Sequence, residues 1–269
     1  MEKTLEDYYN SDYDEINRLE MNKEHSIEYI TTIHFIKKHL VDSCTILDCC
    51  AGGGIYAFPL AEDGYKVIAG DIIPKHVEAI READVDNLLS EICECNALNM
   101  PQFADDTFDV VMCLGALYHL SDYDQRKACI KECLRVLKPN GIFIFSYINR
   151  NARFIHNFMG GRIGAETSLS LFKSAEDAND PFYSFELGEQ NKLVAEFPLS
   201  KITDVGIDGL RYPFYDKINN LSDEEFEKYM EYHFATCEHP SIIGHSMHGL
   251  WIGKKSEGDL RKRKQNDDS

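Results

Sequence analysis

The stretch TILDCCAGGGIYAFPLAEDGYKVIAGD, residues 45–71, decides the fold of this chain. A short apolar run ends at Asp48, and glycines follow at positions 52, 53 and 54. A helix-compatible run over 55–63 stops at Gly64, and a second apolar run ends at Asp71. This order predicts a strand, a glycine turn, a helix and a parallel strand, which together begin a nucleotide-binding α/β unit. Ligands bind at the carboxyl ends of such strands, where Asp71 could accept hydrogen bonds from two ribose hydroxyls.

The alternation of strands and helices continues on both sides of this stretch. Helices are predicted over 26–40 before it and over 75–89 after it. Strands are predicted at 90–95, 108–114 and 142–147, and an amphipathic helix at 122–137. This pattern predicts a doubly wound α/β fold with a mostly parallel seven-stranded sheet and helical lid insertions. Runs at 202–207 and 247–254 can pair as a hairpin, so we expect an antiparallel C-terminal edge strand.

We expect the chain to be divided into three parts. Residues 1–25 are predicted to form an N-terminal cap segment, and residues 26–254 a single domain with insertions at about 149–200 and 211–245. The first insertion could hold a strand at 182–187 and a helix at 190–197, and the second holds a helix at 221–235 with Ser222 as its N-cap. Residues 255–269 have the composition of a charged, disordered tail.

Bulk composition restricts the class of protein. Hydrophobic residues make up 43% of the chain, which supports a packed core. No apolar run approaches the ~20 residues that span a bilayer, and the acidic start MEKTLEDYYNSDYDE is not a secretory signal. We therefore expect a cytoplasmic protein that does not enter a membrane. The net charge of −18 disfavours nucleic acid as a partner, because phosphate binding needs a basic surface.

The cysteines predict neither a disulfide framework nor a metal site. Their number is odd and no secretory signal precedes them, which argues against paired disulfides. No pair has the C-x-x-C spacing of a structural zinc site, so core packing is the expected role. The nine positions are Cys44, Cys49, Cys50, Cys93, Cys95, Cys113, Cys129, Cys133 and Cys237.

These motifs together resemble those of class I S-adenosylmethionine-dependent methyltransferases. ILDCCAGGG is similar to the family's acid-x-G-x-G-x-G loop, with Asp48 as the acid and Gly52 and Gly54 as its second and third glycines. FDVVMCLGALYHL and LRVLKPNGIFIFSY are similar to its fourth strand and loop and to the turn into its fifth strand. GALYHL, YHFATCEHPSIIGHSMHGL and the opening YYNSDYDEINRL further resemble uncharacterised bacterial small-molecule methyltransferases.

The resemblance implies S-adenosyl-L-methionine as cofactor. Cys50 departs from the family pattern because it occupies the place of the first glycine, where a positive φ would strain it. Asn96 stands where an Asp often contacts the adenine amino group, and its amide oxygen can accept the same bond. The predicted cofactor-binding residues are Asp48, Cys50, Ala51, Gly52, Gly54, Asp71, Ile72, Asn96, Ala97, Leu114 and Gly115.

The resemblance also implies a small-molecule methyl acceptor beside the loop after the fourth strand. His119 could act as a general base, since an unperturbed histidine has a pKa of ~6.5, and Tyr118 could assist it or only form the pocket wall. A packing role for His119 stays open. Metal binding by the late histidines has no carboxylate–histidine motif to support it. The predicted substrate-binding residues are Tyr9, Tyr13, Arg18, Tyr118, His119 and His245.

Two other functions stay open at this point. Gly52, Gly54 and Ala57 satisfy a relaxed dinucleotide-binding spacing, which would suit an NAD-dependent oxidoreductase. A non-catalytic cofactor-binding or partner-binding protein could use the same fold, with the insertion at 211–240 as a dimer interface. We expect a monomer or a homodimer, and no residue discriminates between oxygen, nitrogen, sulfur and carbon as the methylated atom.

Overall fold

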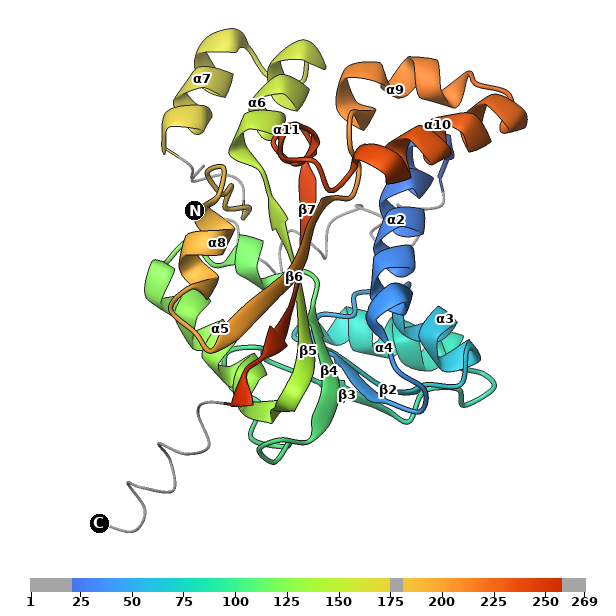
Figure 1. The fold of residues 1–269 in the computed structure, drawn as a ribbon, viewed down its shortest axis with the longest axis vertical. Helices are drawn as coiled ribbons and strands as arrows, with labels where there is room; N and C mark the ends of the chain where they lie inside the picture. The colour runs from blue at the N-terminus through green and yellow to red at the C-terminus, as the bar shows by residue number, and fades with distance from the viewer. Residues whose placement is uncertain (1–20, 175–180, 258–269) are drawn as a thin grey trace.

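The computed structural model of the chain describes residues 21–174 and 181–257, and its centre is one twisted sheet (Figure 1). Within these residues the sheet has seven strands in the order β3-β2-β1-β4-β5-β7-β6. The strands are β1 Thr45–Asp48, β2 Lys66–Asp71, β3 Glu91–Glu94, β4 Phe108–Cys113, β5 Leu137–Ile148, β6 Leu199–Gly206 and β7 His248–Lys255.

Strand direction confirms the predicted fold class. β1 pairs in parallel with β2 on one side and with β4 on the other, and β3 and β5 extend the parallel region. β7 runs antiparallel to both β5 and β6, so β6 forms the edge of the sheet. Because β1, β2 and β4 are parallel neighbours, their carboxyl ends meet at one edge, and the glycine turn leaves β1 there.

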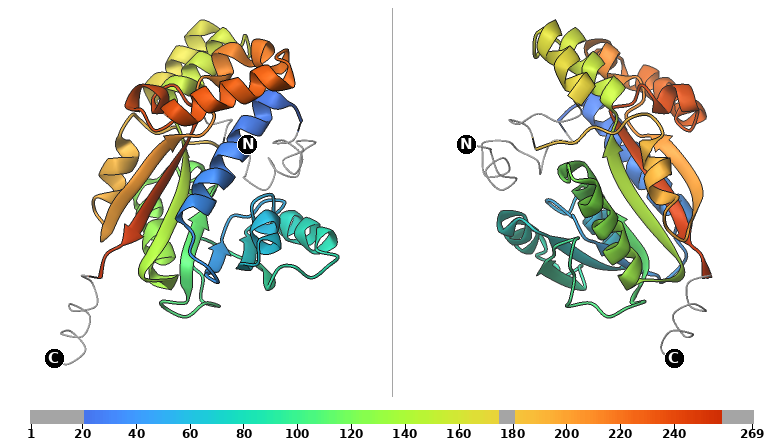
Figure 2. Two further views of the ribbon diagram at one scale, coloured as in Figure 1. Left: turned by 45° about the vertical axis from the view of Figure 1, so that its right-hand side comes forward. Right: turned by 90° about the vertical axis from the view of Figure 1, so that its left-hand side faces the viewer.

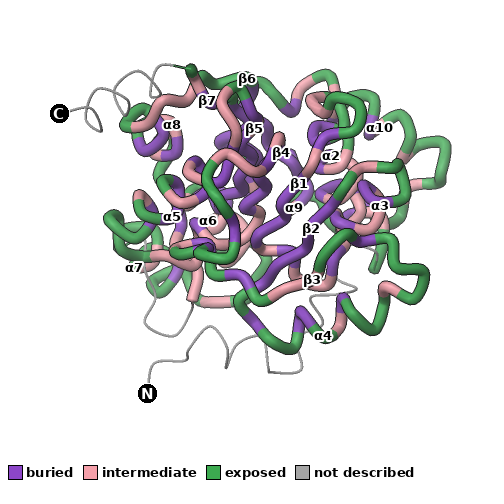
Figure 3. Tube along the Cα trace, turned by 90° about the horizontal axis from the view of Figure 1, so that it is seen from below, coloured by how far each residue is buried: buried purple, intermediate pink, exposed green. Residues whose placement is uncertain are grey.

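Helices cover both faces of the sheet. Helices α2 Lys23–His39, α3 Ala57–Glu62 and α4 Pro74–Ala83 contribute apolar side chains to the core on one face. Helices α5 Tyr123–Val136 and α8 Glu189–Val194 contribute to the core on the other. Figure 3 shows the strands as the buried centre of the molecule, with exposed segments around them.

The remaining helices gather above one end of the sheet, as Figures 1 and 2 show. They are α6 Arg150–Met159, α7 Ala165–Ser174, α9 Arg211–Asn219, α10 Asp223–Thr236 and α11 Pro240–Ile243. They lie within the two sequence ranges expected to be insertions. α9 contacts α2 and α6, so the second insertion reaches over the N-terminal end of α2. No helix in the described part of the chain is long and apolar enough to cross a membrane.

Several predicted boundaries differ from the structure. The helix expected over 75–89 ends at Ala83, because the Asp84 carboxylate accepts hydrogen bonds from the Leu88 and Leu89 amides and forms a turn. β5 begins at Leu137, five residues before the expected start. Within this strand Asn140 adopts a left-handed backbone conformation with φ 64°. The strand expected at 182–187 is wrong, since only a single bridge joins Phe185 to Asn149.

Candidate functional site

The glycine turn after β1 needs glycine at two positions, and Cys50 is not one of them. Gly52 has φ 55° and Gly54 has φ 84°, which is left-handed backbone that L side chains rarely adopt. A Cβ on Gly54 would also lie 2.8 Å from the Phe58 ring. Cys50 does not have a positive φ, so the strain considered for a side chain at this place is absent. Its side chain instead lies against Gly115, where an added Cβ would come within 3.3 Å of the Cys50 Cβ.

Asp71 connects the glycine turn to the end of β2 through hydrogen bonds. Its Oδ2 accepts a hydrogen bond from the Gly52 amide at 2.9 Å, and its Oδ1 accepts one from the Ile73 amide at 2.8 Å. The His76 Nδ1 lies 3.2 Å from the same Oδ1. The carboxylate is buried, yet it lines a cavity. Asp71 therefore holds the turn in place and still faces the space beside it.

Asp48 is a buried carboxyl group with no hydrogen-bond partner among the described residues, for either oxygen. Burial raises the pKa of Asp48 well above its usual range, and the neighbouring Cys50 and Asp71 raise it further. An unpaired carboxylate inside a protein is costly, so this group stays protonated unless a cation approaches it. Its position at the end of β1, directly before the glycine turn, makes the turn favourable for a positively charged ligand.

The first cavity lies over the carboxyl ends of the parallel strands and encloses about 780 Å³, including its open mouth. This size suits a small-molecule ligand. It brings together most of the predicted cofactor residues and both predicted catalytic residues. Those that line it are Cys50, Gly52, Asp71, Ile72, Asn96, Ala97, Leu114, Gly115, Tyr118 and His119. Asp48 and Gly54 line neither this cavity nor the next.

The second cavity lies on the other side of the turn, encloses about 650 Å³, and is bounded by α2, β5 and β7. Glu28 and Thr32 of α2 face it, and Ser146 and His248 come from the two strands. Ala51, a predicted cofactor residue, lines this cavity rather than the first. The residues that line both cavities are Cys50, Gly52, Leu114 and Tyr118, so the two spaces meet at the turn.

His119 lines the first cavity, and its surroundings make its ring a weak base. Its Nδ1 is 3.1 Å from the Pro181 carbonyl oxygen, so Nδ1 carries the proton and donates it there. Burial lowers the pKa of His119 to about 4, so the ring is a weak base at neutral pH. The Tyr118 and Phe182 rings flank it at 4.9 and 4.7 Å between centroids. This environment favours the packing alternative for His119.

His248 and Asp208 form a pair that the sequence did not predict. The His248 Nδ1 lies 2.9 Å from Oδ2 of Asp208, a fully buried carboxylate. The Ser246 hydroxyl donates to Asp208 and accepts from the Gly209 amide at 2.9 Å, which fixes the carboxylate. The Nδ1 proton therefore points to Asp208. No described residue bonds the His248 Nε2, and His248 lines the second cavity, so its lone pair is available there.

Buried charges surround this pair. The Glu28 Oε2 lies 3.4 Å from the His248 Nδ1 and 3.3 Å from an Arg211 guanidinium nitrogen. Arg211 is buried and also bonds Glu24, so one cation offsets two carboxylates of α2. A sequence signal for the pair did exist. Asp208 follows the predicted strand at 202–207, and His248 is the second residue of the run at 247–254 that was predicted to pair with it, so a hairpin brings them together.

The other predicted substrate residues are Tyr9, Tyr13, Arg18 and His245. Tyr9, Tyr13 and Arg18 lie outside the described residues. His245 is exposed after α11, with its Nδ1 2.7 Å from the Ser241 carbonyl oxygen, and it lines neither cavity. The structure thus puts His248, three residues further on, where the sequence suggested His245. His245 stays outside because α11 turns its side chain to the surface.

Comparison with known proteins agrees with this geometry. Residues 47–145 match the methyltransferase domain family. The ubiquinone biosynthesis O-methyltransferase of Idiomarina loihiensis is 28% identical over 168 residues, which are 61% of this chain and 64% of that protein. The protein of the same name from Rickettsia typhi is 34% identical over 155 residues, 56% of this chain and 60% of that protein. The match spans less than two thirds of both relatives.

The fold has relatives among solved structures as well. The crystal structure of the PH0226 protein from Pyrococcus horikoshii matches with a TM-score of 0.58 and 16% identity, over 93% of this chain and 99% of that one. At this identity the likeness concerns the fold alone. It extends the match beyond residue 145 into the region that forms the second cavity.

Proposed function

We propose that this chain, whose methyltransferase domain is of the class I S-adenosylmethionine-dependent type, transfers a methyl group from that cofactor to a nucleophilic atom of a small molecule. The observation that carries the proposal is the pair of cavities that meet at the glycine turn, one beside Asp71 and the other beside His248. The cofactor supplies a methyl group activated on a sulfonium sulfur, so the protein has to position the partners, exclude water and accept a proton.

The residues of the first cavity fit the nucleoside part of this cofactor. Asp71 has lone pairs left for ribose hydroxyls, since each carboxylate oxygen can accept more than one bond. Ile72, which is 50% exposed, and Ala97 offer apolar surface for the adenine ring. Asn96 accepts from the Leu98 amide at 3.0 Å with an oxygen that can accept a second bond. Leu114 and Gly115 line the same cavity as Asp71.

The charged part of the cofactor fits the glycine turn. The turn offers backbone close to the cavities at Gly52 and Ala51, where no bulky side chain intervenes. Asp48 lies beneath it with both carboxylate oxygens unpaired. The sulfonium and ammonium groups are cations, and a nearby cation favours the ionised form of a buried carboxylate. Binding of the cofactor would therefore stabilise Asp48 as well as the ligand.

The second cavity is the place for the acceptor. His248 is the base that we propose there, since Asp208 holds its Nδ1 proton and leaves Nε2 to take a proton from a hydroxyl group. The buried Asp208 also stabilises the imidazolium that forms. The names of the two relatives favour oxygen as the methylated atom. His119 and Tyr118 would then shape the cofactor cavity rather than carry the proton.

The proposed partners and location rest on the whole sequence. A net charge of −18 favours a small molecule over nucleic acid as the acceptor. We propose a cytoplasmic enzyme that acts as a monomer or a homodimer.

Calorimetric titration of the full chain with S-adenosylmethionine tests the proposal directly. The wild type should bind one cofactor, and Asp71→Ala should weaken binding by about 10–100-fold, because hydrogen bonds to a charged group contribute roughly 1.5–3 kcal/mol. Asp86→Asn, an exposed carboxylate after α4, is the matched control and should leave binding unchanged. Reduced nicotinamide dinucleotide in the same cell should give no heat.

Binding alone does not separate an enzyme from a non-catalytic cofactor-binding protein. The second step is therefore turnover of methyl-labelled cofactor against a panel of catechols and phenols, with formation of S-adenosylhomocysteine as the readout. No cofactor binding by the wild type would reject the methyltransferase proposal. Binding without any turnover, on these acceptors or in a metabolite extract, would support the non-catalytic alternative.

A further inference from the structure

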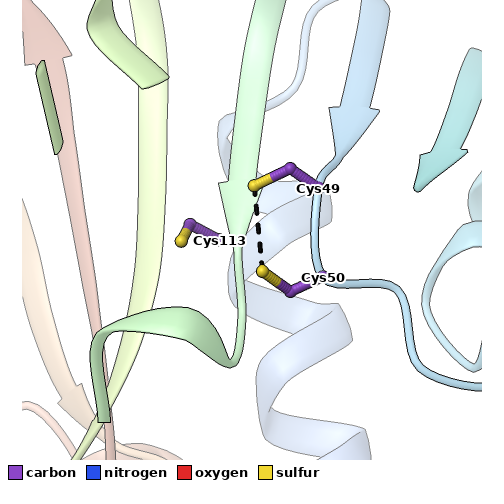
Figure 4. A group of neighbouring side chains, drawn as sticks. All are labelled: Cys49, Cys50 and Cys113. Carbon is purple, nitrogen blue, oxygen red and sulfur yellow. Dashed lines mark hydrogen bonds between the residues drawn. The ribbon is translucent and has the colours of Figure 1, made fainter. Parts of the chain in front are cut away.

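Five cysteines from three elements come together beside the first cavity. Cys49 and Cys50 follow β1, Cys113 ends β4, and Cys129 and Cys133 lie one turn apart on α5. The sulfur atoms of Cys49, Cys50 and Cys113 all lie within 4.8 Å of one another (Figure 4). Cys113 belongs as well to a second group of this kind, with Cys129 and Cys133. The mechanism proposed above uses none of these thiols as a reactive group.

The sulfur spacing in the first group is that of ligands to one metal ion. Thiolates bind Zn²⁺ at about 2.3 Å, so two of them on a tetrahedral ion lie about 3.8 Å apart. The Sγ atoms of Cys49 and Cys50 are 3.9 Å apart, which needs almost no movement. The third sulfur lies within 4.8 Å of both, so a shift of about 1 Å or less would complete the set.

Of the two cysteine groups, the first borders the two cavities described above. Cys50 is half-buried and lines both cavities, and Cys49 lines the first. Cys113 is fully buried directly behind them. Cys129 and Cys133 are also fully buried, in the core between α5 and the sheet, and line neither cavity. An ion would therefore arrive through the cavity and meet Cys50 first, as a metal site requires.

We propose that Cys49, Cys50 and Cys113 bind one soft, thiophilic cation of the class of Zn²⁺ or Cu⁺ in the wall of the cofactor cavity. Thiolates select such ions over hard cations like Mg²⁺. Three protein ligands leave the fourth position of a tetrahedral ion open, and here it faces the cavity. Each thiol releases its proton to solvent as the ion binds.

Carboxyl groups border the cysteine group. The Asp71 carboxylate lines the first cavity together with Cys49 and Cys50, and Asp48 directly precedes Cys49 in the chain. An ion would thus border a cavity whose described basic side chains are His76 and His119.

The proposed metal site would change how the cofactor binds. This one consequence rests on the proposed function. Because three thiols lose their protons as the ion binds, the three thiolates outweigh the charge of Zn²⁺ or Cu⁺, and the group becomes net negative where the two cavities meet. S-adenosylmethionine carries a positive sulfur and S-adenosylhomocysteine a neutral one. The metal-bound site should therefore strengthen binding of the first relative to the second, because opposite charges attract strongly in a poorly hydrated site.

The direct test is metal titration of the reduced full chain without cofactor, so its result does not depend on methyl transfer. Cd²⁺ is the probe, because its thiolate complexes have a charge-transfer absorbance, and Zn²⁺ is then measured by competition with a chelator. We expect one ion per chain with an absorbance that indicates three thiolates. Cys50→Ala should lower the affinity at least about tenfold, since even loss of an outer partner of a metal ligand costs roughly that much.

Cys93→Ala is the matched control, because Cys93 is half-buried like Cys50 but lies on β3 outside the group. It should bind the ion like the wild type. Cys50→Ser, which keeps the size of the side chain, should repeat the loss, and circular dichroism shows that each variant is folded. Absence of a stoichiometric thiolate band in the wild type would overturn the proposal. So would equal affinity in the folded Cys50 variants and the wild type.

Discussion

Gly52 and Gly54 are the residues whose backbone the fold depends on most directly. Both are left-handed, and a Cβ costs roughly 1–2 kcal/mol in that conformation. Gly52→Ala should therefore lower the free energy of unfolding by about that amount, since nothing lies within 4 Å of its added Cβ. Gly54→Ala should cost more, because its Cβ would meet the Phe58 ring at 2.8 Å. Urea unfolding measures both values.

Gly164 offers the control for this pair, because an added Cβ there meets open space and its φ is not in the left-handed range. Gly164→Ala should leave the unfolding midpoint almost unchanged. Equal stability of all three variants would mean that the turn relaxes freely, and the assignment of its two glycines would fail.

His248 is the residue on which the chemistry is predicted to depend. With a hydroxyl acceptor, His248→Gln should lower kcat by roughly 10²–10⁴-fold, the usual contribution of a general base. Asp208→Asn should also lower kcat, because an amide cannot orient the ring or stabilise its charged form in the same way. Calorimetry should show unchanged cofactor affinity, since neither side chain lines the first cavity.

His245→Gln is the matched control for His248, because it changes an exposed histidine three residues away. It should keep full activity. The pH dependence of kcat/KM should lose its acid limb in His248→Gln. If that limb persists there and disappears in His119→Gln instead, the base is His119 and the assignment of His248 is wrong.

At this scale the sequence predicted the residues whose role is local. Gly52, Gly54 and Asp71 lie on one strand–turn–helix–strand unit, and their spacing alone brings them together. His248 and Asp208 are 40 positions apart and meet only through a hairpin whose register the sequence does not determine. The cysteine group is harder still, because it joins β1, β4 and α5. Spacing along the chain showed the helical pair Cys129 and Cys133 but not their approach to Cys113.

Strands β5, β6 and β7 are joined by a buried polar network as well as by their ladders. The Tyr147 hydroxyl of β5 donates to Asp204 of β6 at 2.6 Å, across β7. The Gln190 amide of α8 donates to both, at 3.0 and 2.9 Å. Gly249 of β7 makes this possible, since a Cβ there would lie 2.1 Å from the Tyr147 ring. The network fixes the antiparallel end of the sheet, from which His248 projects.

Tyr147→Phe should weaken this end of the sheet. It removes one hydrogen bond from a buried carboxylate, and a buried acceptor without its donor costs about 1–3 kcal/mol. Urea unfolding should show that loss, and hydrogen exchange should show it concentrated in β6 and β7. Tyr215→Phe, an exposed tyrosine on α9, is the control. A Tyr147 variant as stable as the wild type would show that the Gln190 and Asn191 amides satisfy Asp204 without the tyrosine hydroxyl.

Elements were predicted well where periodicity and end signals agree, as in α10, whose Ser222 forms a capping box with Glu225. Elements were predicted poorly where tertiary contacts determine which structure a segment adopts. The KPNG segment has turn chemistry, yet it lies inside β5 because the ladder to β4 resumes on both sides of Asn140. Residues 182–187 have strand composition, but the chain only touches β5 once there before α8 begins.

At the scale of the whole molecule, three histidines with lowered pKa values lie buried or half-buried in the fold. Burial lowers the pKa values of His119, His156 and His233 to about 4 each. The unfolded chain binds these protons near pH 6.5. Between pH 6.5 and 4 the unfolded state therefore holds more protons than the folded state, so stability falls as the pH is lowered through this window. Carboxylates with lowered pKa values act in the same direction, but only below about pH 4.5.

His233 isolates this effect, because its Nε2 lies 2.9 Å from the Thr31 hydroxyl and Gln can keep that bond. Protonation of Asp48, whose pKa burial raises, stabilises the fold as the pH falls and partly masks the histidines in the wild type. The comparison is therefore between variants. From pH 7 to pH 5, His233→Gln should lose about 2 kcal/mol less unfolding free energy than the wild type, as measured with urea. His245→Gln should lose as much as the wild type, and parallel curves for His233→Gln and the wild type would show that His233 is charged in the folded state.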